Sequence, residues 1–189
     1  MTIPRFYVPG PWTSDRITFP EKASHHAMRV LRMRNGDEAE VFDGEGRTAR
    51  GRTEFSSEGT VLIAESYPEH GRESPLFITL AQAFVSPDKM EWITEKAVEA
   101  GASRIVFFPA ARSVTKLSGD KLTKRLEKLR ATAVSACEQC GRSRIPEIEA
   151  FASAEAMLSG LNADARVILA PSSDPGLALG AARSVVFAV

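Results

Sequence analysis

The chain has 189 residues, with 24 basic and 24 acidic side chains and therefore no formal net charge. The balanced charge excludes a protein that is basic throughout. With 43% hydrophobic and 25% charged residues the chain can fill a core, which excludes a disordered chain. No run approaches the roughly 18 apolar residues of a membrane-spanning helix, and Arg5, Asp15 and Arg16 interrupt the stretch where a signal peptide would be apolar. Two cysteines are too few for a secreted disulfide scaffold, so we expect a cytoplasmic protein.

The first seventy residues show short strand patterns separated by turns. Asn35-Gly36-Asp37 and the glycines within 43–46 suit turns, because glycine and asparagine tolerate positive φ. A short helix is predicted over 24–32, capped by Ser24. On one face of that helix we expect His25 or His26, Met28 and Leu31. Strands are predicted at 5–8, 38–42, 47–55 and 60–64. These elements predict a small β-barrel domain over residues 1–70.

After a polar stretch at 69–75 that suits a linker, the pattern alternates between buried strands and helices. Ser86-Pro87-Asp88 is typical of a helix start, and Gly101 of a helix end. The expected inward positions are Met90, Ile93, Ala97 and Ala100 in the first helix, and Leu122, Leu126, Leu129, Ala133 and Cys137 in the second. Strands are predicted at 76–84, 104–109, 166–170 and 184–189, and helices at 87–101 and 120–139. This alternation predicts a parallel α/β domain over residues 75–189.

Positive charge is concentrated within this second domain. Residues 112–144 hold nine basic and three acidic side chains, a net charge of +6. Together with Arg29, Arg32 and Arg34 in the first domain, they form two basic patches that could bind one polyanion. An ordinary solvated helix face is the alternative, and composition leaves both open.

Cys137 and Cys140 form a C-x-x-C pair, which could indicate redox chemistry or half of a zinc site. The chain has only three histidines and no second cysteine pair to complete four ligands. We therefore interpret the pair as two small core residues of a helix and expect no metal.

A series of short motifs occurs in order along almost the whole chain. They are Ile3-Pro-Arg-Phe-Tyr7, His26 through Val30-Leu31-Arg32-Met33, Val41-Phe42-Asp43-Gly44, Glu95-Lys96-Ala97 through Gly101, Arg112-Ser113-Val114, and Glu138-Gln139-Cys140-Gly141-Arg142 with Ile145-Pro146. In combination they resemble the RsmE family, bacterial 16S rRNA uridine N3-methyltransferases of the SPOUT superfamily. The resemblance implies a PUA-like β-barrel that helps to bind RNA. It also implies a SPOUT-type α/β domain with a trefoil knot that binds S-adenosylmethionine, and a homodimer acting on the small ribosomal subunit.

The resemblance also indicates what the chain lacks and which residues form its sites. Family members continue after the strand at 184–189 with a glycine-rich loop and further helices, so the C-terminal part of the knot is expected to be missing. The cofactor is expected against Leu169, Ala170 and Pro171, with Ala188 and Val189 leading into the absent loop. RNA phosphates are expected on Arg5, Arg29, Arg32, Arg34, Arg112, Lys116, Arg142 and Arg144.

Two questions stay open at this stage. Arg5 suits either an RNA contact or a salt bridge that packs the domain, because a lone arginine specifies little. A non-catalytic module that only docks on ribosomal RNA is the alternative to the enzyme. No residue of the chain stands out as the catalytic base.

Overall fold

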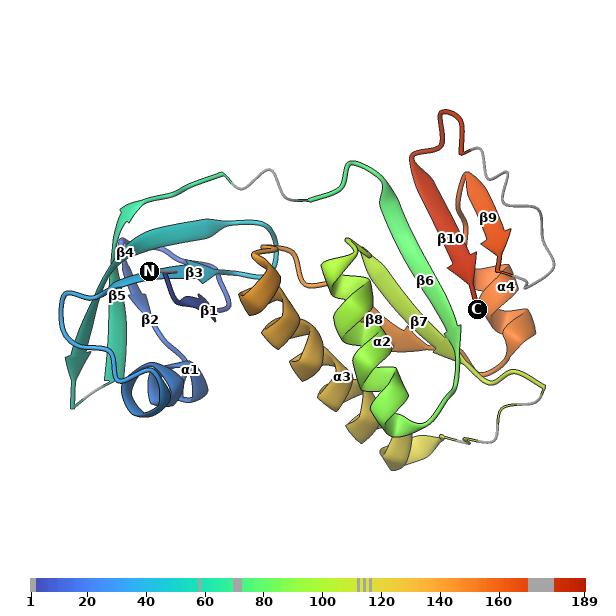
Figure 1. Ribbon diagram of the computed structural model, residues 1–189, viewed down its shortest axis with the longest axis horizontal. Helices are drawn as coiled ribbons and strands as arrows, with labels where there is room; N and C mark the ends of the chain where they lie inside the picture. Colours follow the sequence, from blue (N-terminus) through green and yellow to red (C-terminus); the bar gives the residue numbers. More distant parts are fainter. Residues whose placement is uncertain are drawn as a thin grey trace. The chain divides into compact units, whose positions relative to one another are not determined.

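The computed structural model describes residues 3–57, 59–69, 73–111, 113, 115, 117–169 and 179–189 (Figure 1). The chain forms two compact units. One comprises Met1–Glu73 together with Cys137–Arg144, and the other comprises Ser74–Ala136 and Ile145–Val189. The linear pattern suggested two consecutive segments, whereas the structure groups Cys137–Arg144 with the first unit.

A five-stranded sheet forms the first unit. Its strands are β1 (Arg5–Tyr7), β2 (Arg16–Thr18), β3 (Glu38–Phe42), β4 (Thr48–Ser56) and β5 (Gly59–Ser66). They lie in the order β1-β3-β4-β5-β2, with β1 parallel to β3 and the other pairs antiparallel. The expected strands are confirmed, while the three-residue β2 was not predicted because it is too short to show a period. Its Ile17 nevertheless joins Phe6, Val41 and Leu62 in the core.

The helical segment of this unit differs from its prediction. An α-helix, α1 (Glu21–His25), continues directly as a π-helix, η1 (His26–Val30). The predicted cap at Ser24 is wrong: the helix begins after Pro20, and the buried Ser24 hydroxyl bonds to Thr60 Oγ1 at 2.5 Å. Of the residues expected to share a face, Met28 and Leu31 are exposed and His26 is half-buried, whereas the neighbouring Ala27 is fully buried. A π-helix has a wider turn than the 3.6-residue period used for the prediction, so the set of side chains that share a face changes.

The turn predicted from the glycines within 43–46 is present and connects β3 to β4. Gly44 and Gly46 have φ of 85° and 113°, a region that side chains disfavour. Asp43 Oδ1 accepts hydrogen bonds from the backbone N–H of Glu45 at 2.8 Å and of Arg47 at 3.0 Å. These bonds close the turn between two antiparallel strands, which confirms the turn expected at 43–46.

The second unit contains a parallel five-stranded sheet, as the alternation predicts. Its strands are β6 (Phe77–Ala83), β7 (Arg104–Phe108), β8 (Glu147–Ala150), β9 (Ala165–Ile168) and β10 (Ser184–Ala188). Their order is β8-β7-β6-β10-β9, and every neighbouring pair is parallel. The four-residue β8 was not predicted, because only its Ile148 is apolar and buried.

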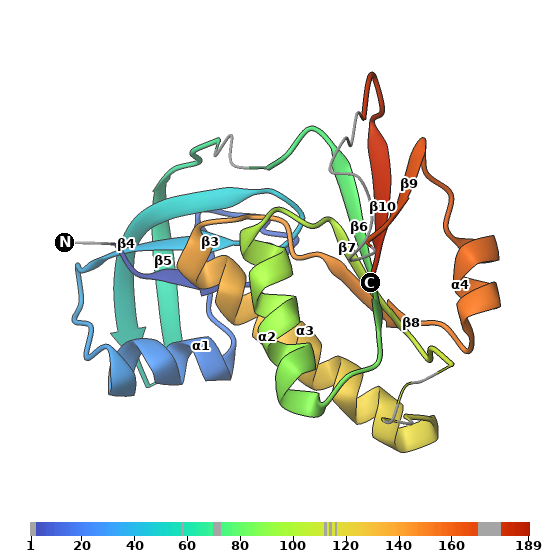
Figure 2. The ribbon, with the colours of Figure 1, turned by 45° about the vertical axis from the view of Figure 1, so that its right-hand side comes forward.

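Helices cover both faces of this sheet. Figure 2 shows α2 (Pro87–Glu99) and α3 (Gly119–Cys140) on one face and α4 (Ala154–Gly160) on the other. The unpredicted α4 inserts Met157 against Val106, Phe108 and Val186 of the sheet. No helix in the described part of the chain is long and apolar enough to cross a membrane.

The predicted inward residues of the two long helices can be compared with their burial in the structure. In α3, three of the five expected inward residues, Leu129, Ala133 and Cys137, are fully buried, and Leu122 and Leu126 are half-buried. In α2, the expected Met90 and Ala97 are buried and Ile93 is half-buried, whereas Ala100 is exposed. Thr94 and Val98 of α2 are also buried, which was not predicted. Thr94 tolerates burial since its hydroxyl donates a hydrogen bond of 2.9 Å to the Met90 carbonyl one turn earlier.

Candidate functional site

Arg5, one of the predicted RNA contacts, lies inside the first unit. Its Nε donates to Glu40 Oε1 at 2.5 Å, and its Nη1 donates to the carbonyl oxygens of Cys137 and Arg142 at 2.9 and 3.0 Å. The guanidinium also lies 4.7 Å from the ring centroid of Phe42. The Arg5 guanidinium thus donates a hydrogen bond to a carbonyl oxygen in the last turn of α3, and its positive charge stabilises the negative end of the helix dipole. These contacts favour the packing role that the sequence left open for Arg5.

Arg142 is held by a carboxylate that the sequence did not single out. Its Nε and Nη2 donate to Glu73 Oε2 at 3.0 and 2.8 Å, and only 6% of its side chain is exposed. Glu73 Oε1 accepts from the backbone N–H of Ser143 and of Arg144, each at 3.0 Å. Burial raises the pKa of Glu73, but these hydrogen bonds outweigh it and lower the net pKa below its ordinary value of 4.5.

The C-x-x-C pair lies at the end of α3, where Cys137 is fully buried, as expected for a core residue. Burial raises the pKa of the Cys137 thiol to about 12, and its Sγ lies 3.6 Å from the Arg144 carbonyl oxygen. Cys140 is half-buried, and neither cysteine is in a disulfide bond. Over the described ranges, no group of three or more His, Cys, Asp or Glu side chains could hold a metal ion.

Four of the predicted RNA-binding arginines are exposed on the first unit: Arg29, Arg32, Arg34 and Arg144. Arg144 packs over Gly46, where an added Cβ would come within 3.0 Å of its Nε. The other predicted RNA contacts of the second segment, Arg112 and Lys116, lie outside the described residues.

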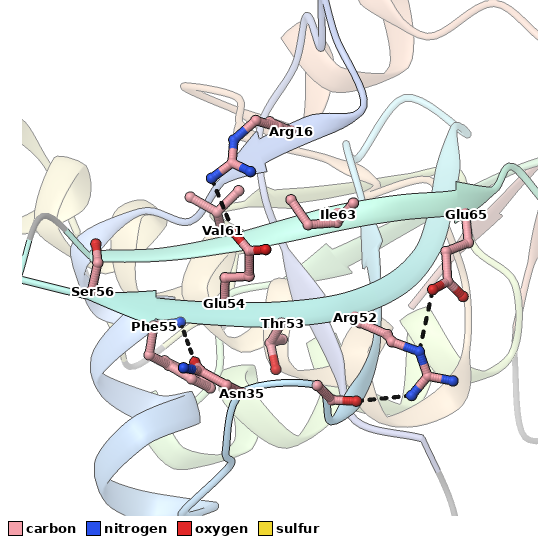
Figure 3. A pocket seen from close by; sticks show the side chains of 11 residues that line it. Arg16, Asn35, Arg52, Thr53, Glu54, Phe55, Ser56, Val61, Ile63 and Glu65 are labelled. Atoms are coloured by element: carbon pink, nitrogen blue, oxygen red, sulfur yellow. Dashed lines mark hydrogen bonds and ion pairs between the residues drawn. The ribbon is translucent and has the colours of Figure 1, made fainter.

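A groove of about 660 Å³ runs along the exposed face of β4 and β5 (Figure 3). Its charged groups are paired with each other. Arg16 Nη2 lies 3.1 Å from Glu54 Oε2, and Arg52 Nε lies 3.2 Å from Glu65 Oε1. Because the arginines are matched by carboxylates, this groove does not present a positive field to a polyanion.

Three of the predicted cofactor residues, Leu169, Ala188 and Val189, lie at the carboxyl edge of the parallel sheet. The Leu169 N–H donates to the Ala188 carbonyl at 3.0 Å, and the Val189 N–H donates to the Ala81 carbonyl at 2.9 Å. Leu169 and Val189 are 55% and 49% exposed. The remaining two, Ala170 and Pro171, lie outside the described residues.

This edge coincides with a switch in the sheet's topology. From the central β6 the chain proceeds outward through β7 and β8 on one side, and β10 and β9 occupy the other. In open parallel sheets, ligands bind beyond the carboxyl ends of the strands at such a switch. The edge beside β6 and β10 is therefore the candidate ligand site of the second unit.

Beside the same strands, an apolar pocket of about 190 Å³ opens under α4. Met157 and Leu161 of α4 and Val167 and Val186 of the sheet contribute to its lining. Ile168 of the edge strand β9 is 72% exposed next to it. The surface around β9 is thus apolar as well as accessible.

Comparison with known proteins is consistent with these two units. Residues 72–188 match the model of an RNA methyltransferase domain, and residues 19–64 match that of an RNA methyltransferase PUA domain. The fold is thus an N-terminal PUA-like domain followed by an α/β methyltransferase domain. The chain belongs to the RNA methyltransferase family that the first of these models describes.

Among its relatives is the ribosomal RNA small subunit methyltransferase E of Bacillus subtilis. It is 34% identical over 126 residues, which cover 66% of this chain and 49% of the relative. The chain thus spans about half the length of this curated relative.

Solved structures of similar fold include two determined with bound S-adenosylmethionine. A methyltransferase of Legionella pneumophila superposes with a TM-score of 0.91 at 26% identity, covering 100% of this chain and 80% of that one. The ribosomal RNA small subunit methyltransferase E of Neisseria gonorrhoeae has a TM-score of 0.86 at 26% identity, covering 99% and 79%.

Proposed function

We propose that this protein is an S-adenosylmethionine-dependent methyltransferase that methylates N3 of a uridine in 16S rRNA of the small ribosomal subunit. The observation that carries the proposal is the match of residues 72–188 to an RNA methyltransferase domain, joined to a PUA domain match at 19–64. The names of the relatives in Bacillus subtilis and Neisseria gonorrhoeae support the substrate class. We place the protein in the cytoplasm, where ribosomal RNA is available.

The proposed cofactor site is the carboxyl edge beside β6 and β10. Leu169, Ala188 and Val189 offer apolar side chains there, which fit an adenosyl group. When bound, S-adenosylmethionine supplies an electrophilic methyl group on its sulfonium. The side chains of these three residues bear no charge, so the charged end of the cofactor requires other groups.

The chemistry asks little of the protein beyond positioning and electrostatics. Uridine N3 is a weak acid, so the base must lose its N3 proton or have the resulting anion stabilised. An arginine beside the uracil carbonyl oxygens suits that role, and no metal or covalent intermediate is needed. We assign no catalytic base.

For RNA binding we propose the exposed arginines Arg29, Arg32, Arg34 and Arg144, with Arg112 and Lys116 from the second segment. The buried and paired Arg5 and Arg142 are positioning residues in this proposal. Arg142 helps to fix the loop that carries Arg144, because Glu73 binds both residues. We further propose a homodimer, which light scattering during gel filtration measures directly.

The test is a methylation assay on small ribosomal subunits that lack the modification. We expect tritium from labelled S-adenosylmethionine to enter 16S rRNA. Primer extension should then stop at one uridine, because an N3 methyl blocks the base-pairing face. The Bacillus subtilis relative serves as the positive control. The assay uses the full-length protein that contains this sequence. If the control labels the subunits and that protein neither labels them nor binds the cofactor in equilibrium dialysis, the proposed enzyme is refuted. Binding of 16S rRNA without cofactor binding would favour the non-catalytic module.

A further inference from the structure

The segment Met28–Arg32 consists of the last three residues of η1 and the two residues that follow it, and we call it the turn. All five of its side chains are exposed. Its three apolar members, Met28, Val30 and Leu31, are 37%, 62% and 44% exposed. Exposed apolar side chains that lie close together on a folded surface are a feature of binding sites, and here three occur within five consecutive residues. The turn therefore has a feature that phosphate binding by arginine alone does not require.

The turn is held in place from both sides. The preceding Ala27 is fully buried, and the following Met33 packs against the core. The Leu31 N–H donates to the His26 carbonyl and the Met33 N–H to the Ala27 carbonyl, each at 3.0 Å. Because these bonds fix the backbone in advance, a partner that binds the turn loses little conformational entropy.

Arg32 adds a backbone feature to the turn. Its φ is 55°, and it is the only residue other than glycine with positive φ in the described part of the chain. Such strained conformations persist where surrounding structure holds them, and they cluster at functional sites. A π-helix, here η1, is likewise frequent at functional sites.

The electrostatics of the turn select an anionic partner. Residues 25–34 contain three arginines and two histidines but no acidic residue. Among the described residues, no salt bridge engages Arg29, Arg32 or Arg34. By contrast, the arginines of the β4–β5 groove are paired with glutamates. The unpaired charge on this turn is available for phosphates.

We propose that the turn Met28–Arg32 binds unpaired RNA, with Val30 and Leu31 against the faces of unstacked bases and the arginines on the flanking phosphates. In a duplex the base faces are covered by stacking, so aliphatic side chains have nothing apolar to contact. Single-stranded loops expose those faces, and proteins recognise them there. This inference rests on the proposed function and specifies the kind of RNA that the first unit selects.

The test compares two RNAs by fluorescence anisotropy with the 189-residue chain. One is a labelled hairpin of 16S rRNA sequence with an unpaired loop, and the other is a fully paired duplex with the same number of phosphates. Because the apolar contact of two aliphatic side chains is removed, Val30→Ser with Leu31→Ser should weaken hairpin binding about tenfold and leave duplex binding unchanged. Leu158→Ser, an exposed leucine of the second unit that is 50% accessible, is the matched control and should change neither.

A second variant removes the charge and keeps the backbone. Arg29→Gln, Arg32→Gly and Arg34→Gln are combined, because glycine retains the positive φ at position 32. The slope of log affinity against log salt should become shallower by about 2, from roughly 0.7 for each lost phosphate contact on a single strand. An unchanged slope would contradict the phosphate contacts.

The outcomes separate this inference from the proposed function. If the wild-type chain binds neither RNA nor small subunits, the proposed function fails. If it binds the hairpin and the serine variant binds equally well, or loses hairpin and duplex alike, the inference alone is overturned. Loss of binding to intact subunits with unchanged hairpin affinity would assign the turn to a ribosomal protein, which also overturns it.

Discussion

Glu73 accepts hydrogen bonds from Arg142, Ser143 and Arg144 in the loop after α3. Its charge should therefore contribute measurably to the free energy of unfolding. The substitution Glu73→Gln keeps the size of the side chain and removes the charge. The amide oxygen can still accept from the backbone N–H groups of Ser143 and Arg144. What is lost is the ion pair with Arg142, whose side chain is only 6% exposed.

The expected cost follows from these contacts. Breaking a fully buried ion pair costs about 3–5 kcal/mol. Glu73 is 21% exposed, and glutamine preserves two of the four hydrogen bonds, so the expected loss is smaller. We expect the free energy of unfolding of the first unit to fall by roughly 2–3 kcal/mol. In a chain of this size that lowers Tm by about 4–12 °C.

Tryptophan fluorescence can report the first unit separately. The chain has two tryptophans, Trp12 in the first unit and Trp92 in the second. In a Trp92→Phe background, urea unfolding followed by fluorescence reports Trp12 alone. Glu45→Gln, at an exposed glutamate for which the described residues offer no ion pair, is the matched control and should leave the midpoint unchanged.

The dependence on pH provides an independent check. The folded pKa of Glu73 lies below its ordinary value of 4.5, so its stabilising effect is complete above that pH. The difference between wild type and Glu73→Gln should stay constant from pH 7 to 4.5 and shrink as the pH falls further. A loss below about 0.5 kcal/mol at pH 7, or a difference that grows in acid, would refute the reasoning.

Three further predictions follow from local geometry. Arg5→Lys should lower the stability of the first unit by about 2 kcal/mol, since one ammonium cannot reach all three acceptors, and should leave the salt dependence of RNA binding unchanged. A change in the slope of log RNA affinity against log salt would indicate that Arg5 contacts RNA phosphate. Gly51→Ala should cost about 3 kcal/mol in urea unfolding, because its Cβ would lie 1.8 Å from the Ile63 carbonyl oxygen. Iodoacetamide at pH 8 should modify at most Cys140 in the folded protein, since roughly one part in 10,000 of Cys137 is thiolate at a pKa of about 12; two adducts by mass spectrometry would contradict this.

Most of the secondary structure could be predicted from local sequence patterns. The strand β3 lies at the predicted residues, and the parallel strands β6, β7 and β10 match within two residues at each end. Long apolar runs and glycine punctuation carry this information, because they depend on neighbours within a few positions. The short elements β2, β8 and α4 were missed, since three to seven residues contain too few periods to detect.

The helical turn of the first unit shows a different limit. A period of 3.6 residues predicted a face shared by His25 or His26, Met28 and Leu31, whereas the structure exposes Met28 and Leu31 and places Ala27 in the core. The switch from α1 to η1 decides which side chains face the core. A tertiary contact that the local pattern does not show, the hydrogen bond between Ser24 and Thr60, joins α1 to β5 across 36 residues of sequence.

The sequence alone was sufficient to indicate a two-part α/β protein, the family resemblance and the residues that carry positive charge. It could not separate arginines that stabilise the fold from arginines that are free for a ligand. Arg5 and Arg142 are neutralised by Glu40 and Glu73, at separations of 35 and 69 residues, while Arg32 is exposed. Only tertiary structure decides this difference, because the burial of a charge depends on a partner that chain folding brings beside it.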